Sequence, residues 1–432
     1  MRKILSFAIV TAVVAYFAAC SVEMDYNPNY EKPILKNPYV VSIPQAIDRL
    51  NAMFPNSVTA TRSRISEVTT LSRKDLGLVT RSSTTADAPL IYIVPTDNNG
   101  CAVMGADSRM TPLYAALEST TLTAEDFLSM NTRTDSGDSQ EEDSEIREFV
   151  AGLLYDAATD DYLELPSIPW DSTKYPNPDI SLFYYIDSLT ENHQAYLATK
   201  WCQKEAPYNS NLPDHLDSVA GCTTIAVAQI VYHNRLPQAI GMTTFNWDKI
   251  STFEYGNTSL PKYPNDVANF IRKIAIELNV EPNDRGVGAN FQDVYDFFIE
   301  HYRPLNYIVE ESNYNEDAII YMINKTHPVY IDGINSSNGN GHAWVLDGYR
   351  KYEIYRHNTL NGERTNTDSC KYYFHSNFGV KGQYDGYYLS KIFDLRQMRN
   401  PEFVIDSIGD IAQQIGAYYD SEFDIIFYDK IN

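Results

Sequence analysis

The spacing of apolar residues predicts helices in the middle of the chain and strands towards its end. Apolar positions recur at helical intervals in residues 222–234 (CTTIAVAQIVYHN), 267–278 and 291–301. After Pro328, short segments rich in β-branched and aromatic residues predict strands: VYIDGI, HAWVLDGYR, KYEIYRH, CKYYFHSNF and DGYYLS. Helices followed by strands, rather than alternating with them, indicate an α+β fold.

The N-terminal third predicts a smaller α+β unit. Residues 42–54 have the periodicity of an amphipathic helix, and LIYIVPTDNNGCAVMGADSRM predicts two strands joined by a turn at residues 97–100. We expect the Ser/Thr/Arg-rich stretch between them, Thr59 to Asp87, to form a loop. Residues 131–148 hold seven acids and Ile146 as their one apolar residue, which predicts a solvated domain boundary, with a short helix over 146–157 after it.

The charge balance excludes one class of partner. The chain has 34 Lys and Arg against 57 Asp and Glu, a formal net charge of −23. Nucleic-acid binding needs clustered basic residues, so we expect no nucleic-acid partner. Motifs for nucleotide, metal and serine-hydrolase chemistry (Walker loop, GxGxxG, HExxH, EF-hand, GxSxG) are absent from the sequence, as is zinc-type Cys/His spacing. We therefore expect no cofactor and no metal.

Residues 1–20 have the pattern of a secretory signal that ends at a cysteine. Arg2 and Lys3 precede an apolar run, and two alanines directly precede Cys20. This arrangement resembles a bacterial lipobox, in which signal removal leaves a lipid on the cysteine. The alternative is an ordinary signal peptide cut near Ala19. The sequence thus predicts an exported lipoprotein of the bacterial cell envelope, attached to the membrane through Cys20 and released if it is processed.

Cys222 is the candidate nucleophile. It follows Gly221 and opens a predicted apolar helix, where unpaired backbone N–H groups and the helix dipole favour a thiolate. The same N–H groups can stabilise an oxyanion. From position alone, a buried structural cysteine is the competing interpretation.

His342 and Gln203 are the candidate base and oxyanion donor. His342 begins a predicted strand after a Gly/Ser/Asn-rich loop and can face a cleft, although a structural histidine is the alternative. Gln203 lies upstream of the cysteine, and a side-chain amide there can stabilise an oxyanion. His233 lies at the far end of the Cys222 helix, about 16 Å away at 1.5 Å per residue, too far to act as its base.

Four motifs, in order, resemble the streptopain family of bacterial cysteine peptidases. They are W-x-Q-x-x-x-P-Y-N, G-C-x-x-x-A-x-A-Q-I-x-Y-H, P-V-Y…G-H-A-W-V-L-D-G-Y and F-H-S-N-F-G-V-K-G-Q-Y-D-G-Y-Y, within residues 199–389. Residues 40–130 resemble the family's inhibitory pro-domain. The resemblance implies a papain-like α+β fold, in which a central nucleophile helix accompanies an antiparallel sheet, preceded by a small α+β pro-domain.

The resemblance also implies residue roles. Cys222 would be the nucleophile, His342 the general base and acid, and Gln203 the oxyanion donor, with Asn377 as a further catalytic residue. The substrate backbone would bind at Gly286, Val287 and Gly341. His375 matches the family's non-catalytic histidine and is the second candidate for the base. The sequence departs from the family pattern at Val287, where serine is usual, and at Phe378 and Val380, where tryptophans are usual.

The resulting hypothesis is a lipid-anchored zymogen of a cysteine endopeptidase. It would act on protein or peptide substrates and be held inactive by its own pro-domain as an intramolecular inhibitor. The alternative is a catalytically degenerate homologue that serves as a surface binding or protease-inhibitor lipoprotein. The predicted domains are a signal peptide (1–19), a tether (20–37), a pro-domain (38–131), an acidic linker and helix (132–185) and a peptidase domain (186–432).

Overall fold

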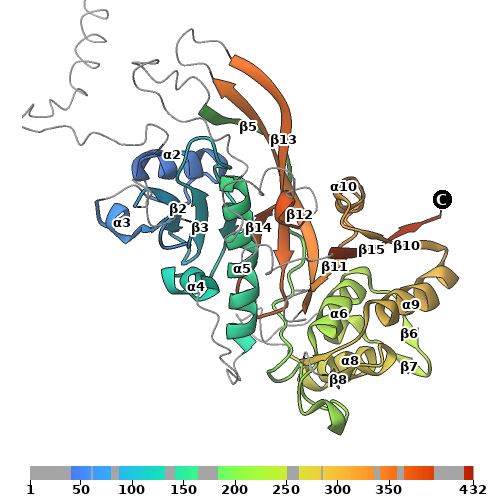
Figure 1. Cartoon of the computed structure of the whole chain (residues 1–432). Helices are drawn as coiled ribbons and strands as arrows, with labels where there is room; N and C mark the ends of the chain where they lie inside the picture. The colour runs from blue at the N-terminus through green and yellow to red at the C-terminus, as the bar shows by residue number, and fades with distance from the viewer. Residues whose placement is uncertain are drawn as a thin grey trace, which may run out of the picture. The chain divides into compact units, whose positions relative to one another are not determined.

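The computed structural model, drawn in Figure 1, describes most of the chain after residue 39. The described ranges are 40–59, 62–78, 87–131, 142–163, 183–250, 262–283, 286–334, 341–357, 364–393 and 423–431. All of them lie in one compact unit, Pro38–Asn432. Cys20, with the predicted signal peptide and tether, lies outside the described residues. None of the helices in these ranges is long and apolar enough to cross a membrane.

An antiparallel sheet of eleven strands organises the described part of the chain. In spatial order its strands are β1 (Thr69–Ser72), β2 (Pro89–Pro95), β3 (Cys101–Gly105), β4 (Ala115–Leu117), β14 (Gly386–Leu389), β13 (Arg364–Asn377), β12 (Gly341–His357), β11 (Val329–Ile334), β15 (Phe423–Lys430) and β10 (Tyr307–Asn313). Strand β5 (Phe183–His193) pairs with β12 off this path. Because helices accompany this antiparallel sheet, the predicted α+β class is confirmed.

The sheet joins the predicted pro-domain to the predicted peptidase domain. Strand β4 pairs with β14, with Leu117 opposite Gly386 and Ala115 opposite Tyr388. The N-terminal strands β1 to β4 therefore extend the same sheet that carries β11 to β13. The backbone of residues 115–117 covers an edge of β14 that would otherwise present unpaired N–H and C=O groups.

The second half of the described chain contains five helices, of which the periodicity predicts the first, third and fourth. They are α6 (Cys222–Asn234), α7 (Trp247–Ile250), α8 (Pro264–Glu277), α9 (Phe291–Tyr302) and α10 (Glu316–Asn324). Helix α6 is buried at every position from Thr223 to Val231, and it packs against α8 and β12. A helix that is apolar all round belongs in a core. The predicted central helix behind Cys222 is confirmed.

The N-terminal predictions hold only in part. Helix α2 (Ile43–Met53) and the β2–β3 hairpin are confirmed. The stretch predicted as a loop, residues 59–87, instead contains α3 (Arg62–Glu67) and β1, followed downstream by α4 (Ala124–Leu128). Strand β1 forms by pairing with β2, a long-range contact that its four residues do not reveal as a pattern.

Helix α5 (Glu142–Leu163) corrects the prediction of a solvated linker. It is 22 residues long and includes residues 142–148 of the acidic run, so it begins before and ends after the short helix predicted over 146–157. Its buried side chains are Ile146, Phe149, Val150, Ala151, Leu153, Leu154, Tyr155, Ala157 and Ala158. Helix α5 contacts β2 and the 3₁₀ helix at Ser390–Phe393 (η4), which supplies the apolar partners that stabilise it.

The segments predicted as two strands, HAWVLDGYR and KYEIYRH, form the single strand β12. The length of β12 is explained by pairing on both of its edges, with β5 far upstream in the sequence and with β13 directly downstream. Short elements complete the described part: β6 (Ala239–Ile240), β7 (Thr243–Thr244), β8 (Glu281–Asn283), β9 (Gly286–Gly288), η1 (Ser129–Asn131), η2 (Asp214–Leu216) and η3 (Arg303–Leu305).

Candidate active site

Cys222 is the first residue of α6 and is partly exposed. Gly221 before it has φ of 83°, and a Cβ there would lie 2.7 Å from the carbonyl oxygen of Val287, so only glycine fits. Burial raises the pKa of the Cys222 thiol to about 11. The backbone N–H groups of Ala343 and Thr223 act in the opposite direction and lower it, but by less. The thiolate expected from the helix start is therefore not favoured in this chain, because desolvation outweighs the N–H groups.

His342 lies on β12 with only 5% of its surface exposed. One ring nitrogen, Nε2, lies 3.0 Å from the backbone oxygen of Phe378. The imidazole packs against Trp344 and Phe378, at centroid distances of 6.2 and 5.9 Å, and against Phe149 of α5 at 5.9 Å. Burial lowers the pKa of His342 to about 4, so the imidazole is neutral at pH 7.

The predicted nucleophile and the predicted base are neighbours through the backbone, but their side chains are not paired. The N–H of Ala343, the residue after His342, lies at the Cys222 thiol. Within the described residues, however, no hydrogen bond joins the side chains of Cys222 and His342. A protonated thiol beside a neutral histidine that faces a backbone carbonyl is not a thiolate–imidazolium pair.

Gln203 and Asn377 are both buried near these residues. The backbone oxygen of Gln203 accepts a hydrogen bond from Ala220 at 2.9 Å, which ties Gln203 to the start of α6. The Asn377 amide donates to the Thr199 oxygen at 3.0 Å and accepts from Gly379 at 3.1 Å. Asn377 thus holds the turn that presents the Phe378 carbonyl to His342, and its expected catalytic role stays a prediction.

The predicted substrate-binding residues flank Cys222. Gly286 and Val287 belong to β9, and Ala289 just after it donates to Thr223 Oγ1 of α6 at 3.0 Å. The side of Gly286 where a Cβ would point is open. Gly341, the first residue of β12, is exposed and directly precedes His342. The structure therefore brings all three glycine-loop candidates to the surroundings of Cys222 and His342, and their binding role stays a prediction.

His375 belongs to a separate charged cluster. Its Nδ1 lies 2.5 Å from Asp347 Oδ1, and its Nε2 lies 3.6 Å from Glu118 Oε1. Burial acts to lower the pKa of His375, but the carboxylates of Asp347 and Glu118 raise it well above its usual range. Because its protonated form is favoured, His375 is a poor acceptor for the proton of Cys222. His233 is engaged elsewhere, with Nε2 3.0 Å from the Thr326 oxygen.

The family departures at Phe378 and Val380 keep apolar side chains in the core. Both residues are buried. The Phe378 ring is stacked on Trp344 at 5.3 Å and on His342 at 5.9 Å. Phenylalanine thus still provides an aromatic wall beside the histidine.

Sequence reasoning missed two residues at this site. Phe149 lies on α5, far from the motifs in sequence, and contacts His342 and Trp344. Asp332 lies on β11 and raises the Cys222 pKa through its charge. The acid within the otherwise apolar strand VYIDGI was a visible signal for Asp332, whereas no sequence signal marks Phe149.

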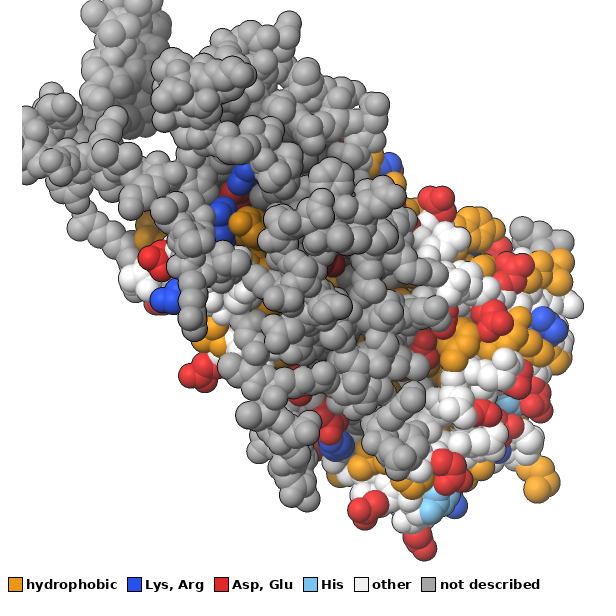
Figure 2. Space-filling model, in the orientation of Figure 1, with side chains coloured by type: hydrophobic (Ala, Val, Ile, Leu, Met, Phe, Trp, Pro, Cys, Tyr) orange, Lys and Arg blue, Asp and Glu red, His pale blue; other side chains and the backbone are white. Residues whose placement is uncertain are grey.

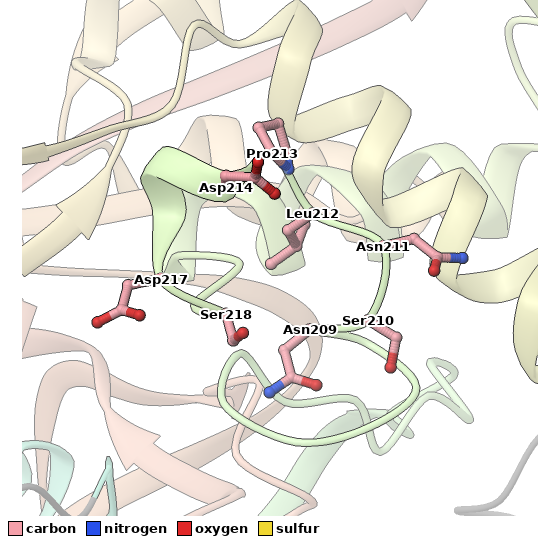
Figure 3. Close-up of a pocket in the computed structure, with 8 residues that line it drawn as sticks. All are labelled: Asn209, Ser210, Asn211, Leu212, Pro213, Asp214, Asp217 and Ser218. Carbon is pink, nitrogen blue, oxygen red and sulfur yellow. The ribbon is translucent and has the colours of Figure 1, made fainter.

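Two other features of the described part are separate from this site. A polar depression of about 340 Å³ is lined by the loop residues drawn in Figure 3: Asn209, Ser210, Asn211, Leu212, Pro213, Asp214, Asp217 and Ser218. A group of potential metal ligands, Glu277, Glu300 and His301, lies on α8 and α9, with Lys273 Nζ 2.8 Å from Glu277. Neither includes a predicted catalytic residue.

The described surface is acidic on the face shown in Figure 2, where Asp and Glu side chains are spread over it with scattered Lys and Arg. That face offers no continuous basic surface among its described residues. The view agrees with the net charge of −23.

Three comparisons with known proteins give the following similarities. Residues 201–388 match the model of the Peptidase C10 family. A prointerpain A fragment of Prevotella intermedia shares 17% identity, with 78% of this chain and 95% of that chain covered and a TM-score of 0.47. The active interpain A cysteine protease of the same organism shares 19% identity, with 56% and 98% covered and a TM-score of 0.36. No curated protein matches the chain.

The family match is the informative comparison. It spans the residues that carry Gln203, Cys222 and His342, together with the turn at Phe378. It supports a cysteine peptidase in the C-terminal part of this chain, with similarity to the Peptidase C10 family over residues 201–388.

Proposed function

We propose that the chain is the latent precursor of a cysteine endopeptidase that hydrolyses peptide bonds through Cys222 and His342. The observation that carries this proposal is the placement of α5. Its Phe149 packs on the imidazole of His342, whose Nε2 faces the Phe378 carbonyl. The groups for catalysis are close together in the chain's fold, but an element outside the matched residues 201–388 covers one of them.

The proposed reaction is acyl transfer through a thioester. Once His342 is free, it takes the proton of Cys222, and Sγ bonds to the substrate carbonyl carbon while the C=O electron pair moves to oxygen. The backbone N–H of Cys222 and the Gln203 amide stabilise that oxyanion. The oxyanion collapses, the C–N bond breaks and His342 gives its proton to the leaving amine. Water then attacks the thioester, which releases the acid and restores the thiol.

The contacts of the N-terminal unit support a role as intramolecular inhibitor. Tyr352 of β12 donates to the Met53 oxygen at 2.6 Å, and Tyr373 of β13 donates to the Leu113 oxygen at 2.9 Å. The Arg350 guanidinium lies 4.2 Å from the centroid of the Phe54 ring. These contacts join the backbone pairing of β4 with β14, so the unit is held to the sheet that carries His342.

The contact of Phe149 with His342 supports a proposal for the position of the activating cut. A cut before α5 leaves Phe149 attached to the peptidase part. A cut between residues 164 and 182 separates α5 from it while keeping β5, which pairs with β12. We therefore propose that activation requires cleavage after Leu163.

Self-processing provides the test of this function. Wild type and Cys222→Ala are incubated side by side under reducing conditions, and peptidase activity and fragment masses are followed. The proposal expects a fragment that begins after residue 163 only from wild type, with activity rising as it appears. If an added protease cleaves wild type between residues 164 and 182 and the product remains inactive, the proposed function is contradicted.

A catalytically degenerate binding protein is the second candidate function. The observation in its favour is that Phe378 and Val380 stand where the streptopain family usually has tryptophans. The stacking of Phe378 on both His342 and Trp344 argues against it, because the aromatic support of the histidine persists. Activity, not binding, is therefore the function to be tested first.

We also propose that Cys20 carries a lipid that attaches the exported chain to a membrane of the cell envelope. The lipobox-like sequence before Cys20 supports this. A Cys20→Ser variant should stop incorporating labelled palmitate and move from the membrane fraction to the soluble fraction. Wild type that is soluble and unlabelled would exclude the lipid. Cleavage after Leu163 would free the peptidase part from this anchor.

The Glu118–His375 contact makes inhibitor docking dependent on pH. His375, whose Nε2 lies 3.6 Å from Glu118 Oε1, lowers the pKa of Glu118 below its ordinary 4.5. A lowered pKa in the docked state stabilises docking above pH 4.5, and this contribution is lost as pH falls through the docked pKa.

We expect Glu118→Gln to weaken docking near pH 6 and to flatten its change towards pH 4. The measurement is retention of the cut N-terminal part on the inactive Cys222→Ala protein by gel filtration. The exposed Glu125 of α4 provides the control, Glu125→Gln, which should behave like the parent. Equal pH profiles for Glu118→Gln and parent would exclude the contact as a pH-dependent element.

A further inference from the structure

An acidic side chain lies beside the proposed nucleophile. Asp332 of β11 is directly opposite Ala343 of β12, whose N–H lies at the Cys222 thiol. On its other side Asp332 is opposite Asp424 of β15. Through this register Asp332 is a neighbour of Cys222, and its negative charge adds to burial, the larger cause, in raising the pKa of the thiol.

The surroundings of Asp332 are aromatic and apolar. Tyr330 shares its strand face and donates to Asp332 Oδ2 at 3.3 Å. The Tyr330 ring lies 6.3 Å from Phe291, the first residue of α9 and close in sequence to β9. Successive side chains of a strand point to opposite faces of the sheet. His342, which precedes Ala343 on β12, therefore lies on the face opposite to Asp332, where it contacts Phe149.

Asp332 is partly exposed, and among the described residues it has no cationic partner. Within the described residues, no Lys, Arg or His forms an ion pair with it, and its hydrogen bond comes from the neutral Tyr330. A carboxylate at this position disfavours the thiolate that catalysis needs. A partly buried acid is costly unless a cation compensates it.

We infer that Asp332 is a specificity-determining residue that selects substrates with a Lys or Arg side chain within two residues of the scissile bond. This inference rests on the proposed peptidase function. A bound ammonium or guanidinium would neutralise Asp332, satisfy its free oxygen and remove the charge that opposes ionisation of Cys222.

The preference of the enzyme for substrates with a Lys or Arg side chain should depend on pH. Burial, followed by the charge of Asp424, raises the pKa of Asp332 to about 7. The groups that face it are Cys222 from α6, Tyr330 from its own strand and Asp424 from β15, while β12 contributes the uncharged Ala343. Asp332 is therefore largely neutral at pH 6 and ionised at pH 8, and the preference for a basic side chain should rise between these values.

Matched peptides test this inference on the processed enzyme. Two fluorogenic series carry either Lys or norleucine at each of the two positions on either side of the scissile bond. Wild type should show a kcat/KM ratio of Lys to norleucine of about ten at one position, which is what a single charge-assisted hydrogen bond provides. In Asp332→Asn the ratio should fall to about one, with the norleucine peptide still cleaved, and the ratio should no longer change with pH.

Asp429→Asn is the matched control, because Asp429 lies on β15 and pairs with Lys325 instead. Its ratio should equal that of wild type. Equal cleavage of the Lys and norleucine peptides by wild type would overturn the specificity role and leave the peptidase proposal intact. Cleavage of neither peptide, with Cys222 unreactive towards a thiol-directed epoxide, would overturn the peptidase proposal and this inference with it.

Discussion

Cys222→Ala and His342→Ala should each lower peptide hydrolysis by the processed enzyme by about 10⁴-fold or more, because nucleophile and base act as one unit. The loss should appear in kcat, measured as initial rates on a fluorogenic peptide at saturating concentration. Cys222→Ala should leave the fold intact because Cys222 is small and partly exposed, whereas His342→Ala also removes ring contacts, so its folding is checked by circular dichroism.

Two variants control for this result. Cys370 is an exposed free cysteine, and His233 lies at the far end of α6. Cys370→Ala and His233→Ala should both retain activity within a few-fold of wild type. Retention of activity in Cys222→Ala would exclude Cys222 as nucleophile. Retention in His342→Ala alone would assign the base to another residue.

Phe149→Ala should make the uncut chain reactive. Removal of the ring uncovers His342, so we expect Cys222 in the full-length protein to react about tenfold faster with a thiol-directed epoxide, read by mass spectrometry. The same change leaves a cavity in α5, and a buried Phe→Ala substitution costs about 3–5 kcal/mol of the free energy of unfolding.

Phe127→Ala separates reactivity from loss of stability. Phe127 is fully buried on α4 and makes no ring contact with His342. It should lower the free energy of unfolding by a similar amount without a comparable gain in labelling. Equal gains in both variants would mean that general loosening, rather than release of His342, exposes the thiol.

The elements whose apolar residues repeat at regular intervals could be predicted from the sequence alone. Helices α6, α8 and α9 and strand β11 lie where periodicity predicts them, since their apolar residues repeat at regular intervals. Strand β1 depends on pairing with β2, and the full length of β12 depends on pairing with β5, which lies far upstream in the sequence. Helix α5 is the clearest case, because its acidic start predicted solvent while its later residues pack against β2 and η4.

The site shows the same division. The motifs predicted Cys222, His342 and Gln203 as site residues. Cys222 opens α6, His342 lies at the start of β12, and Gln203 is hydrogen-bonded to Ala220 just before α6. The protonation behaviour could not be foreseen, because it depends on burial. The helix start favours a thiolate, yet desolvation raises the pKa of Cys222 to about 11. That burial comes from packing that no motif encodes.

The most direct test of the central claim compares two cuts in the same chain. A site for one specific protease is introduced either into residues 132–141, before α5, or into residues 164–182, after it. Each protein is cleaved to completion and assayed on the same peptide beside its uncut form. Only the cut in residues 164–182, after α5, should release peptidase activity. An uncut chain as active as either cut form, or equal activation by both cuts, would contradict the claim that α5 keeps His342 from Cys222.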